Sequence, residues 1–259
     1  MEYTLNIRGQ LMSLSKPCVM GILNVTPDSF YAESRTMTDD DIARRAHQIA
    51  DEGAAIIDIG ACSTRPGSTP VSQDEELARL RRALTIVRRE LPRSVVSVDT
   101  FRPDVARIAV EEYGADIIND VAPSDEMLRM VSRLRTPYII TSCQATLADT
   151  LIFFAERVQR LRDMGHTDII LDPGFGFGKT LEENYAILNQ LDRLLIMELP
   201  LLVGLSRKSM IWRLLDIEPA DALCATTALN AIALTKGASI LRVHDVREAV
   251  QCVRLVSAL

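Results

Sequence analysis

The apolar positions of this chain recur as short runs that alternate with longer amphipathic segments. Short apolar runs bounded by polar residues are typical of strands buried in a parallel sheet, and apolar residues at every third or fourth position are typical of helices. The short runs predict strands at residues 18–23, 54–59, 95–98, 117–118, 138–140, 169–171, 201–203 and 240–243. The longer segments predict helices at residues 38–52, 72–90, 103–113, 125–134, 147–164, 181–191, 209–215, 220–236 and 247–257.

The two kinds of element alternate, and this gives eight strand-then-helix units in 259 residues. Such alternation implies parallel strands joined by helical crossovers, and eight units fit a closed (β/α)8 barrel. Residues 5–7 and 11–12 flank a turn-like segment at 8–10, which predicts a short hairpin ahead of the barrel. We therefore predict an α/β protein, a TIM barrel in which residues 1–259 form a single domain with a short N-terminal hairpin. The alternative is an open doubly wound sheet, which would need fewer interior strands or a second domain.

Charge and cysteine content narrow the class of protein. The net charge of −6 argues against a broad nucleic-acid surface, which requires a basic face. The five cysteines are dispersed without a Cys-x-x-Cys pair, and with only three histidines the sequence indicates no zinc cluster. Dispersed thiols, an N-terminus unlike a signal peptide and the lack of a bilayer-length apolar stretch predict a cytoplasmic protein without a membrane partner.

Polar residues follow every predicted strand. In a barrel, the C-terminal ends of the strands build the active site. Asp99, Asn119 and Asp172 each end an apolar run, so each would stand at a dry barrel mouth and need hydrogen-bonding partners. A flat heterocycle with several N–H and C=O groups would supply them. Any one strand-end Asp or Asn could instead be a turn former or helix cap. The strand-end set comprises Asn24, Asp58, Asp99, Asn119, Thr141, Asp172, Lys208, Arg242 and His244.

A second set of candidates is cationic. Arg65, Lys208, Arg242 and His244 follow the second, seventh and eighth predicted barrel strands, and guanidinium and ammonium groups suit phosphate oxygens. Asn24 could add a neutral ligand to the phosphate or to its metal ion. For Arg207 the simpler interpretation is a solvated charge.

The glycine-rich segment at residues 174–180 is similar to a phosphate-binding loop, but Pro173 occupies the position where that pattern requires its first glycine. We therefore place the phosphate elsewhere and predict Lys179 as the start of a helix. Other residues have simpler interpretations. His47 and His166 are predicted as surface or helix-end residues, and the charges of residues 72–93 as a solvated face.

Seven segments, at residues 20–30, 63–67, 97–100, 118–120, 172–179, 204–209 and 242–246, together resemble the signatures of the dihydropteroate synthase family. They include Asn24-Val25-Thr26-Pro27-Asp28 and Ser63-Thr64-Arg65-Pro66. The resemblance implies a (β/α)8 barrel that forms a dimer through its late helices and is a target of sulfonamides. Such an enzyme joins 6-hydroxymethyl-7,8-dihydropterin pyrophosphate to 4-aminobenzoate and releases pyrophosphate with Mg²⁺, a transferase reaction of folate biosynthesis.

The resemblance also implies roles for individual residues. Pterin-binding positions match Asp99, Asn119, Asp172 and Lys208. Pyrophosphate-binding positions match Asn24, Arg65, Arg242 and His244, and Asn24 also matches the metal position. Aminobenzoate-binding positions match Thr64, Phe177 and Ser206. The catalytic set would be Asp99, Asp172, Lys208 and Arg242.

The chain departs from the family pattern at four places. Residues 31–35 replace a Ser-Asp-Gly-Gly-like loop, and Cys62 stands where the family has an acid. Thr141-Ser142-Cys143 replaces a Met-His-Met segment beneath the pterin, and residues 144–154 form a shorter segment than usual. Two alternatives therefore stay open. One is a methyltetrahydrofolate-dependent methyltransferase, which needs no pyrophosphate clamp, and the other is a divergent paralogue that binds pterin with little or no turnover.

Overall fold

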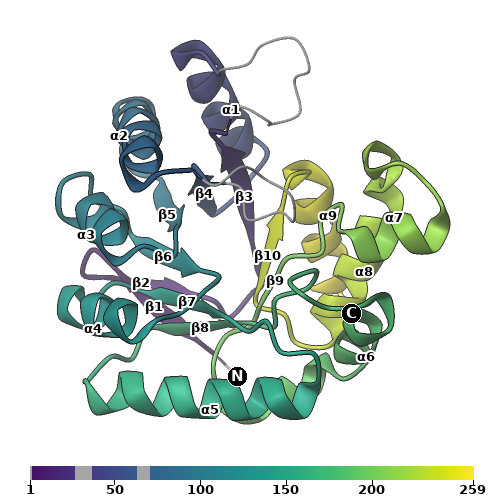
Figure 1. Ribbon diagram of the computed structural model, residues 1–259. Coiled ribbons are helices and arrows are strands. Elements are labelled where there is room, and N and C mark those ends of the chain that lie inside the picture. The colour runs from purple at the N-terminus through teal and green to yellow at the C-terminus, as the bar shows by residue number, and fades with distance from the viewer. Residues whose placement is uncertain (1, 27–36, 63–70) are drawn as a thin grey trace.

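The structure is a computed structural model and describes residues 2–26, 37–62 and 71–259. Its strands are β1 (Thr4–Ile7), β2 (Gln10–Ser13), β3 (Cys18–Asn24), β4 (Ile56–Gly60), β5 (Val95–Asp99), β6 (Ile117–Asp120), β7 (Tyr138–Thr141), β8 (Ile169–Asp172), β9 (Leu202–Val203) and β10 (Ile240–Val243). Its α-helices are α1 (Asp39–Asp51), α2 (Gln73–Glu90), α3 (Pro103–Glu111), α4 (Asp125–Leu134), α5 (Leu147–Asp163), α6 (Leu181–Asn189), α7 (Ser209–Leu215), α8 (Leu223–Thr235) and α9 (Val246–Val256). Figure 1 shows these helices arranged around a central ring of strands.

The ring is a parallel eight-stranded sheet in the order β8-β7-β6-β5-β4-β3-β10-β9. A parallel bridge between Leu171 and Leu201 joins the two end strands, so the sheet closes on itself. The bridge continues β9, which is only two residues long, and closure is therefore weakest there. The predicted (β/α)8 barrel is confirmed, and the open doubly wound alternative is wrong.

The barrel interior has an apolar floor. Successive residues of a strand point to opposite faces, so alternate residues face the interior while the others pack against the helices. The predicted hairpin is confirmed, because β1 pairs antiparallel with β2. Leu5, Ile7 and Leu14 from this N-terminal segment pack into the floor and close that end of the barrel. The strand residues of the floor are Met20, Ile56, Ile117, Ile139, Ile170, Leu202 and Ile240.

A polar layer lies directly above this floor. Two residues further along, the inner faces of six strands carry Asp58, Ser97, Asn119, Thr141, Asp172 and Arg242. The residues between them, such as Ile57, Val98 and Ile140, belong to the outer core beneath the helices. Because the strands are parallel, all of these polar side chains lie toward the same, C-terminal end of the barrel.

Helix boundaries follow the predicted caps with local exceptions. Thr38 and Asp41 form a capping box at the start of α1. Ser72 caps α2 by accepting from the backbone N–H of Glu75, but the Glu75 carboxylate bonds Arg79 rather than closing the predicted capping box. Helix α8 begins later than residue 220 because Pro219–Asp221 forms a 3-10 turn. A second 3-10 helix, Leu191–Met197, follows α6 and had no counterpart in the sequence prediction. Within the described ranges, no helix combines the length and apolarity needed to cross a bilayer.

Candidate active site

Arg242 lies between two carboxylates in the polar layer. Its Nε donates to Asp58 Oδ2 at 2.7 Å, and its Nη2 donates to Asp99 Oδ2 at 2.7 Å. Asn119 approaches the same cluster, with its Nδ2 3.4 Å from Asp58 Oδ2. The Asp58 side chain is fully buried, whereas those of Arg242 and Asp99 are 18% and 15% exposed. Strands β4, β5, β6 and β10 thus bring Asp99 and Asn119 of the predicted pterin set together with Arg242 of the predicted cationic set.

The charges of this cluster are unevenly balanced. Burial raises the pKa of Asp99 to about 7. The charge of Arg242 opposes this rise, whereas the charge of Asp58 adds to it. Burial alone would lower the pKa of Arg242, but the two carboxylates raise it, so the guanidinium stays charged. One guanidinium between two carboxylates leaves a surplus of negative charge when both are ionised. Such a cluster suits a ligand that offers N–H donors or gains positive charge.

Asp172 supplies a further carboxylate at the end of β8. It is 7% exposed, and its Oδ1 accepts from the backbone N–H of Gly174 at 2.8 Å. Burial raises the pKa of this carboxyl group, and the Gly174 hydrogen bond opposes the rise. In the sheet register Asp172 lies opposite Thr141 of β7. The end of the barrel predicted for pterin recognition therefore carries acids from β5 and β8.

The glycine turn after β8 depends on backbone conformations that favour glycine. Gly174 and Gly176 have φ angles of +66° and +81°. A Cβ on Gly174 would lie 2.2 Å from Ser142 O, and one on Gly176 would lie 3.0 Å from Lys208 Cδ. The turn thereby leaves room for the Lys208 stem, whose Nζ lies 4.4 Å from the centre of the Phe177 ring. Lys208 and Phe177, predicted for different substrates, are adjacent.

Lys179 is not the start of a helix. Helix α6 begins at Leu181 and is capped by Thr180. The Lys179 ammonium instead donates to Ser142 O at 3.0 Å and to Gly174 O at 2.9 Å. It therefore ties the segment after β7 to the turn after β8. Sequence spacing gave no signal for this, because both acceptors are backbone carbonyl groups.

Ser206 and His244 form a pair across the ends of β9 and β10. Ser206 Oγ accepts from the backbone N–H of His244 at 3.1 Å and lies 3.0 Å from His244 Nδ1. Either group can be the donor of the second bond, because the hydroxyl oxygen has a further lone pair and the imidazole has two tautomers. The resemblance implied aminobenzoate for Ser206 and pyrophosphate for His244, and the structure joins the two positions.

Arg207 is not a solvated charge. Its Nε and Nη2 form a forked pair with Asp245, each bond 2.9 Å long. Its Nη1 also donates to the backbone carbonyl groups of Pro219 and Ala220. Arg207 thus fixes the segment between β9 and α7 against the segment that follows β10, which positions its neighbours Ser206 and Lys208.

Asn24 places an amide oxygen at the end of β3. It lies opposite Gly60 of β4, and a Cβ on Gly60 would come within 3.1 Å of Asn24 Oδ1. Amide and phosphate oxygens are ligands that Mg²⁺ accepts, usually with few protein groups and several waters. Among the described residues, no group of three or more His, Cys, Asp or Glu could hold a metal ion by itself. An amide oxygen of this kind fits a metal ion that is held mainly by phosphate oxygens and water.

Some predicted positions fall outside the described residues. Thr64 and Arg65 do, and so does the loop at 31–35 that departs from the family pattern. The departures at the end of β7 lie within the described residues. Thr141 and Ser142 are buried, and Cys143 is exposed with its Sγ 3.6 Å from Val121 O.

Glu76 shows where the solvated-face interpretation of residues 72–93 fails. This side chain is fully buried and accepts from Thr100 Oγ1 at 2.7 Å and from Arg102. Arg102 also donates to Val71 O at 2.6 Å, so the group ties the start of α2 to the segment after Asp99. Position 76 lies on the same helical face as Leu80, and that spacing is the signal that could have identified it.

Asp58 and Asp120 are further buried acids. Asp58 was noted as a strand-end residue without a role, although an acid inside an apolar run signals a buried partner. Asp120 Oδ2 accepts from Tyr138 Oη at 2.7 Å on the outer face of the sheet, away from the polar layer. Burial raises the pKa of Asp120 to about 6.

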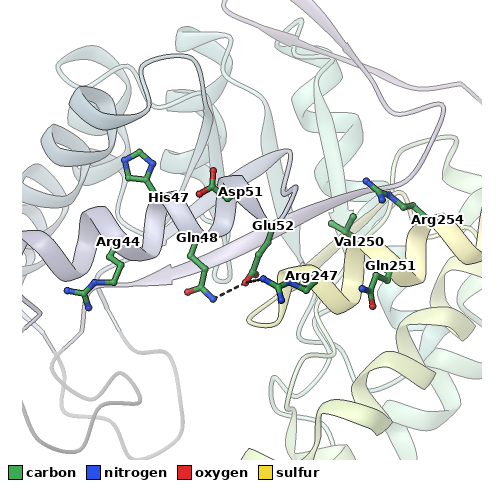
Figure 2. A pocket seen from close by; sticks show the side chains of 9 residues that line it. All are labelled: Arg44, His47, Gln48, Asp51, Glu52, Arg247, Val250, Gln251 and Arg254. Atoms are coloured by element: carbon green, nitrogen blue, oxygen red, sulfur yellow. Dashed lines mark hydrogen bonds and ion pairs between the residues drawn. The ribbon is translucent and has the colours of Figure 1, made fainter.

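Two histidines lie away from the site. His47 is a surface residue, as predicted, with Nε2 3.5 Å from Glu90 Oε2. It lines a groove of about 770 Å³ between α1 and α9, which Figure 2 shows on the outer side of these helices with Glu52 joined to Gln48 and Arg247. His166 follows the end of α5, which agrees with the helix-end interpretation, but it is only 4% exposed and therefore not a surface residue. Burial lowers the pKa of His166.

Comparison with known proteins agrees with this geometry. A family described as pterin binding enzymes matches residues 20–244. Dihydropteroate synthase of Escherichia coli strain K12 is 38% identical over 97% of this chain and 94% of its own length. The Bacillus subtilis dihydropteroate synthase is 37% identical over 94% of this chain and 89% of its own.

Solved structures agree with the sequence relatives. Xanthomonas albilineans dihydropteroate synthase with 4-aminobenzoic acid superimposes with a TM-score of 0.91 at 36% identity, covering 100% of this chain and 98% of that one. The Yersinia pestis dihydropteroate synthase with a sulfonamide drug complex gives a TM-score of 0.90 at 37% identity, covering 99% and 98%. Similarity of this extent in both sequence and fold shows that the chain belongs to the pterin-binding enzymes, and among them to the dihydropteroate synthase family.

Proposed function

We propose that this chain catalyses the dihydropteroate synthase reaction of folate biosynthesis, in which 6-hydroxymethyl-7,8-dihydropterin pyrophosphate and 4-aminobenzoate give 7,8-dihydropteroate and pyrophosphate. The observation that carries the proposal is the acid-rich polar layer around Arg242, with Asp99 and Asp58 each 2.7 Å from its guanidinium. The family relatives are transferases of this kind. All 259 residues are proposed to form one domain that serves this function.

The pterin ring would lie above the apolar floor and present its polar edges to Asp99, Asn119 and Asp172. Carboxylate oxygens accept from ring N–H and amino groups, and the Asn119 amide can both donate and accept. Lys208 would donate to a ring oxygen while its ammonium stays over the Phe177 face, 4.4 Å from the ring centre. Because these groups are buried, each unpaired atom would be costly, so a ligand that satisfies several at once is favoured.

The leaving pyrophosphate would lie at the opposite edge of the mouth, near Asn24, Arg242 and His244, with Arg65 as a further predicted ligand. His244, whose Nδ1 lies 3.0 Å from Ser206 Oγ, would donate an imidazole N–H to a phosphate oxygen. Asn24 would hold Mg²⁺ through its amide oxygen together with the phosphates, and that ion, when bound, supplies charge neutralisation for the departing group.

The carbon–oxygen bond to pyrophosphate breaks as positive charge develops on the pterin methylene. Asp99 and Asp172 are held in place before the reaction and stabilise that charge. The aromatic amine of 4-aminobenzoate then attacks the methylene carbon and loses a proton. Phe177, Ser206 and Thr64 are the residues proposed to position it. The chemistry requires no protein nucleophile, which agrees with a site built of acids, cations and amides.

Pyrophosphate release in the presence and absence of 4-aminobenzoate and Mg²⁺ tests the proposal. We expect release that depends on both, because the amine is the acceptor and the metal ion assists departure. The Asp172→Asn variant should lose pterin affinity, as measured by calorimetry, since it removes the ring-binding charge. Purified protein that releases no pyrophosphate above background at high enzyme concentration would rule the activity out.

The divergent paralogue is kept as the second candidate because Cys62 and the segment Thr141-Ser142-Cys143 depart from the family pattern. Tight binding of pterin pyrophosphate without aminobenzoate-dependent turnover would favour it. We also infer a homodimer through the late helices, where Leu214, Leu215 and Ile232 are exposed. A cytoplasmic location is part of the same proposal. Sedimentation at micromolar concentration tests the dimer. A sulfonamide that competes with 4-aminobenzoate would place both ligands in one site.

A further inference from the structure

Four buried polar atoms of the inner layer have no hydrogen-bond partner in the described part of the chain. They are Asp58 Oδ1, Ser97 Oγ, Asn119 Oδ1 and Thr141 Oγ1. Each residue is at most 2% exposed, and they come from the four successive strands β4 to β7. Native proteins rarely leave such atoms unpaired, because each has lost its water without a replacement. The layer is therefore built to receive further hydrogen-bonding groups.

Thr141 has the most defined orientation among the four. It shares the inner face of β7 with Ile139 of the floor, while Ser142 points outward and lies 3.5 Å from Thr150. The Thr141 methyl group packs toward the turn after β8, because a Cβ on Gly174 would lie 2.9 Å from Thr141 Cγ2. With the methyl group on that side, the hydroxyl group is turned away from the Gly174 turn.

The neighbour of Thr141 across the sheet is Asp172, the proposed anchor of the pterin ring. One oxygen of that carboxylate already accepts from Gly174. The edge of a pterin ring that carries the 2-amino group offers two amino hydrogens as well as a ring N–H, more donors than the remaining Asp172 oxygen can accept well. The Thr141 hydroxyl oxygen, on the neighbouring strand and without a partner of its own among the described residues, can accept the additional amino hydrogen.

We propose that Thr141 is a further pterin-binding residue of this chain, whose hydroxyl group hydrogen-bonds the 2-amino group of the ring beside Asp172. The inference rests on the proposed function. It makes Thr141, which departs from the family pattern at the end of β7, part of substrate recognition. It also predicts that a ring with only a hydrogen in place of the 2-amino group gains nothing from this hydroxyl group, because such a ring has neither an amino donor nor an oxygen acceptor at that position.

Calorimetric binding of two ligands to matched variants tests this. The ligands are 6-hydroxymethylpterin and its 2-desamino counterpart, which has a hydrogen in place of the amino group. Thr141→Val removes the hydroxyl with little change of shape, Thr141→Ser keeps it, and Ser142→Ala removes the outward-facing hydroxyl next to it. We expect Thr141→Val to weaken pterin binding about tenfold, as loss of a partner for a buried donor does, with the 2-desamino ligand unaffected and both other variants close to wild type.

Two results would overturn the inference. Pterin binding by Thr141→Val at wild-type strength would mean that an enclosed water satisfies the hydroxyl instead. Equal weakening of both ligands would mean a general packing effect. If Thr141→Val does not fold, Thr141→Ala gives the same comparison of the pterin with its 2-desamino counterpart. Failure of the wild-type protein to bind either ligand would instead contradict the proposed function, so the two failures are distinguishable.

Discussion

Arg242 donates to Asp99 across 2.7 Å, so a residue expected to hold pyrophosphate is hydrogen-bonded to a residue expected to hold the pterin. The pair links β5 and β10, which lie on either side of β4 and β3 in the sheet. In the proposed complex, the Arg242 guanidinium would therefore contact the pyrophosphate of the substrate while it is bonded to a carboxylate of the pterin site. The charge that leaves with the pyrophosphate and the charge that develops on the pterin are then stabilised by neighbouring atoms.

Asp58 accepts from the other side of the Arg242 guanidinium. The Asp58→Asn variant tests how much this ion pair contributes to the free energy of unfolding. We expect a loss of roughly 1–3 kcal/mol of unfolding free energy, because a buried charge partner of Arg242 is removed. Urea unfolding measures it. Asp39→Asn is the matched control, since Asp39 also pairs with an arginine Nε, that of Arg82, but both side chains are exposed. Exposed pairs contribute about 1 kcal/mol or less, so equal losses in the two variants would contradict a special role for Asp58.

Pterin affinity should fall as the pH is lowered through about 7, the pKa to which burial raises Asp99. The raised pKa means that the folded protein binds the Asp99 proton more tightly than the unfolded chain does. The contribution of Asp99 to stability is therefore present at low pH and is lost as the pH rises toward 7. Ligand binding has the opposite sign, because recognition of ring N–H groups requires the carboxylate. Calorimetry between pH 5.5 and 8.5, a range of about 1.5 units either side, checks this.

The charge of Asp120 adds to the raised pKa of Asp99, although Asp120 lies outside the polar layer. Asp120→Asn should therefore shift the profile toward lower pH and keep binding at high pH. A profile that is flat in the wild type, or that does not move toward lower pH when Asp120 is replaced, would contradict the assignment to Asp99.

Lys179→Met tests the tie between the segments after β7 and β8. The variant keeps the stem and loses both backbone hydrogen bonds, so we expect pterin affinity to fall together with roughly 1–3 kcal/mol of stability. Lys236→Met is the comparison, because Lys236 also donates to a backbone carbonyl group, that of Asn189, far from the site. It should change stability alone. Wild-type pterin affinity in Lys179→Met would show that the tie does not position Asp172.

The barrel could be predicted from the sequence because buried parallel strands and their crossover helices have different periods. The strand-end residues could be predicted for the same reason, since each polar residue stands where an apolar run stops. The pairing of Arg242 with Asp58 could not, because it depends on how the strands stagger around the barrel. Lys179 and Arg207 were misjudged because their acceptors are backbone carbonyl groups and a distant Asp245, which leave no local pattern.

Formation of 7,8-dihydropteroate tests the central claim most directly. Purified protein is incubated with dihydropterin pyrophosphate, Mg²⁺ and 4-aminobenzoate, and the product is identified by mass spectrometry and quantified against released pyrophosphate. The predicted result is equimolar dihydropteroate and pyrophosphate, with neither formed by Asp172→Asn at a comparable rate. Tight binding of the pterin substrate without any dihydropteroate would contradict the claim and identify the chain as a pterin-binding paralogue.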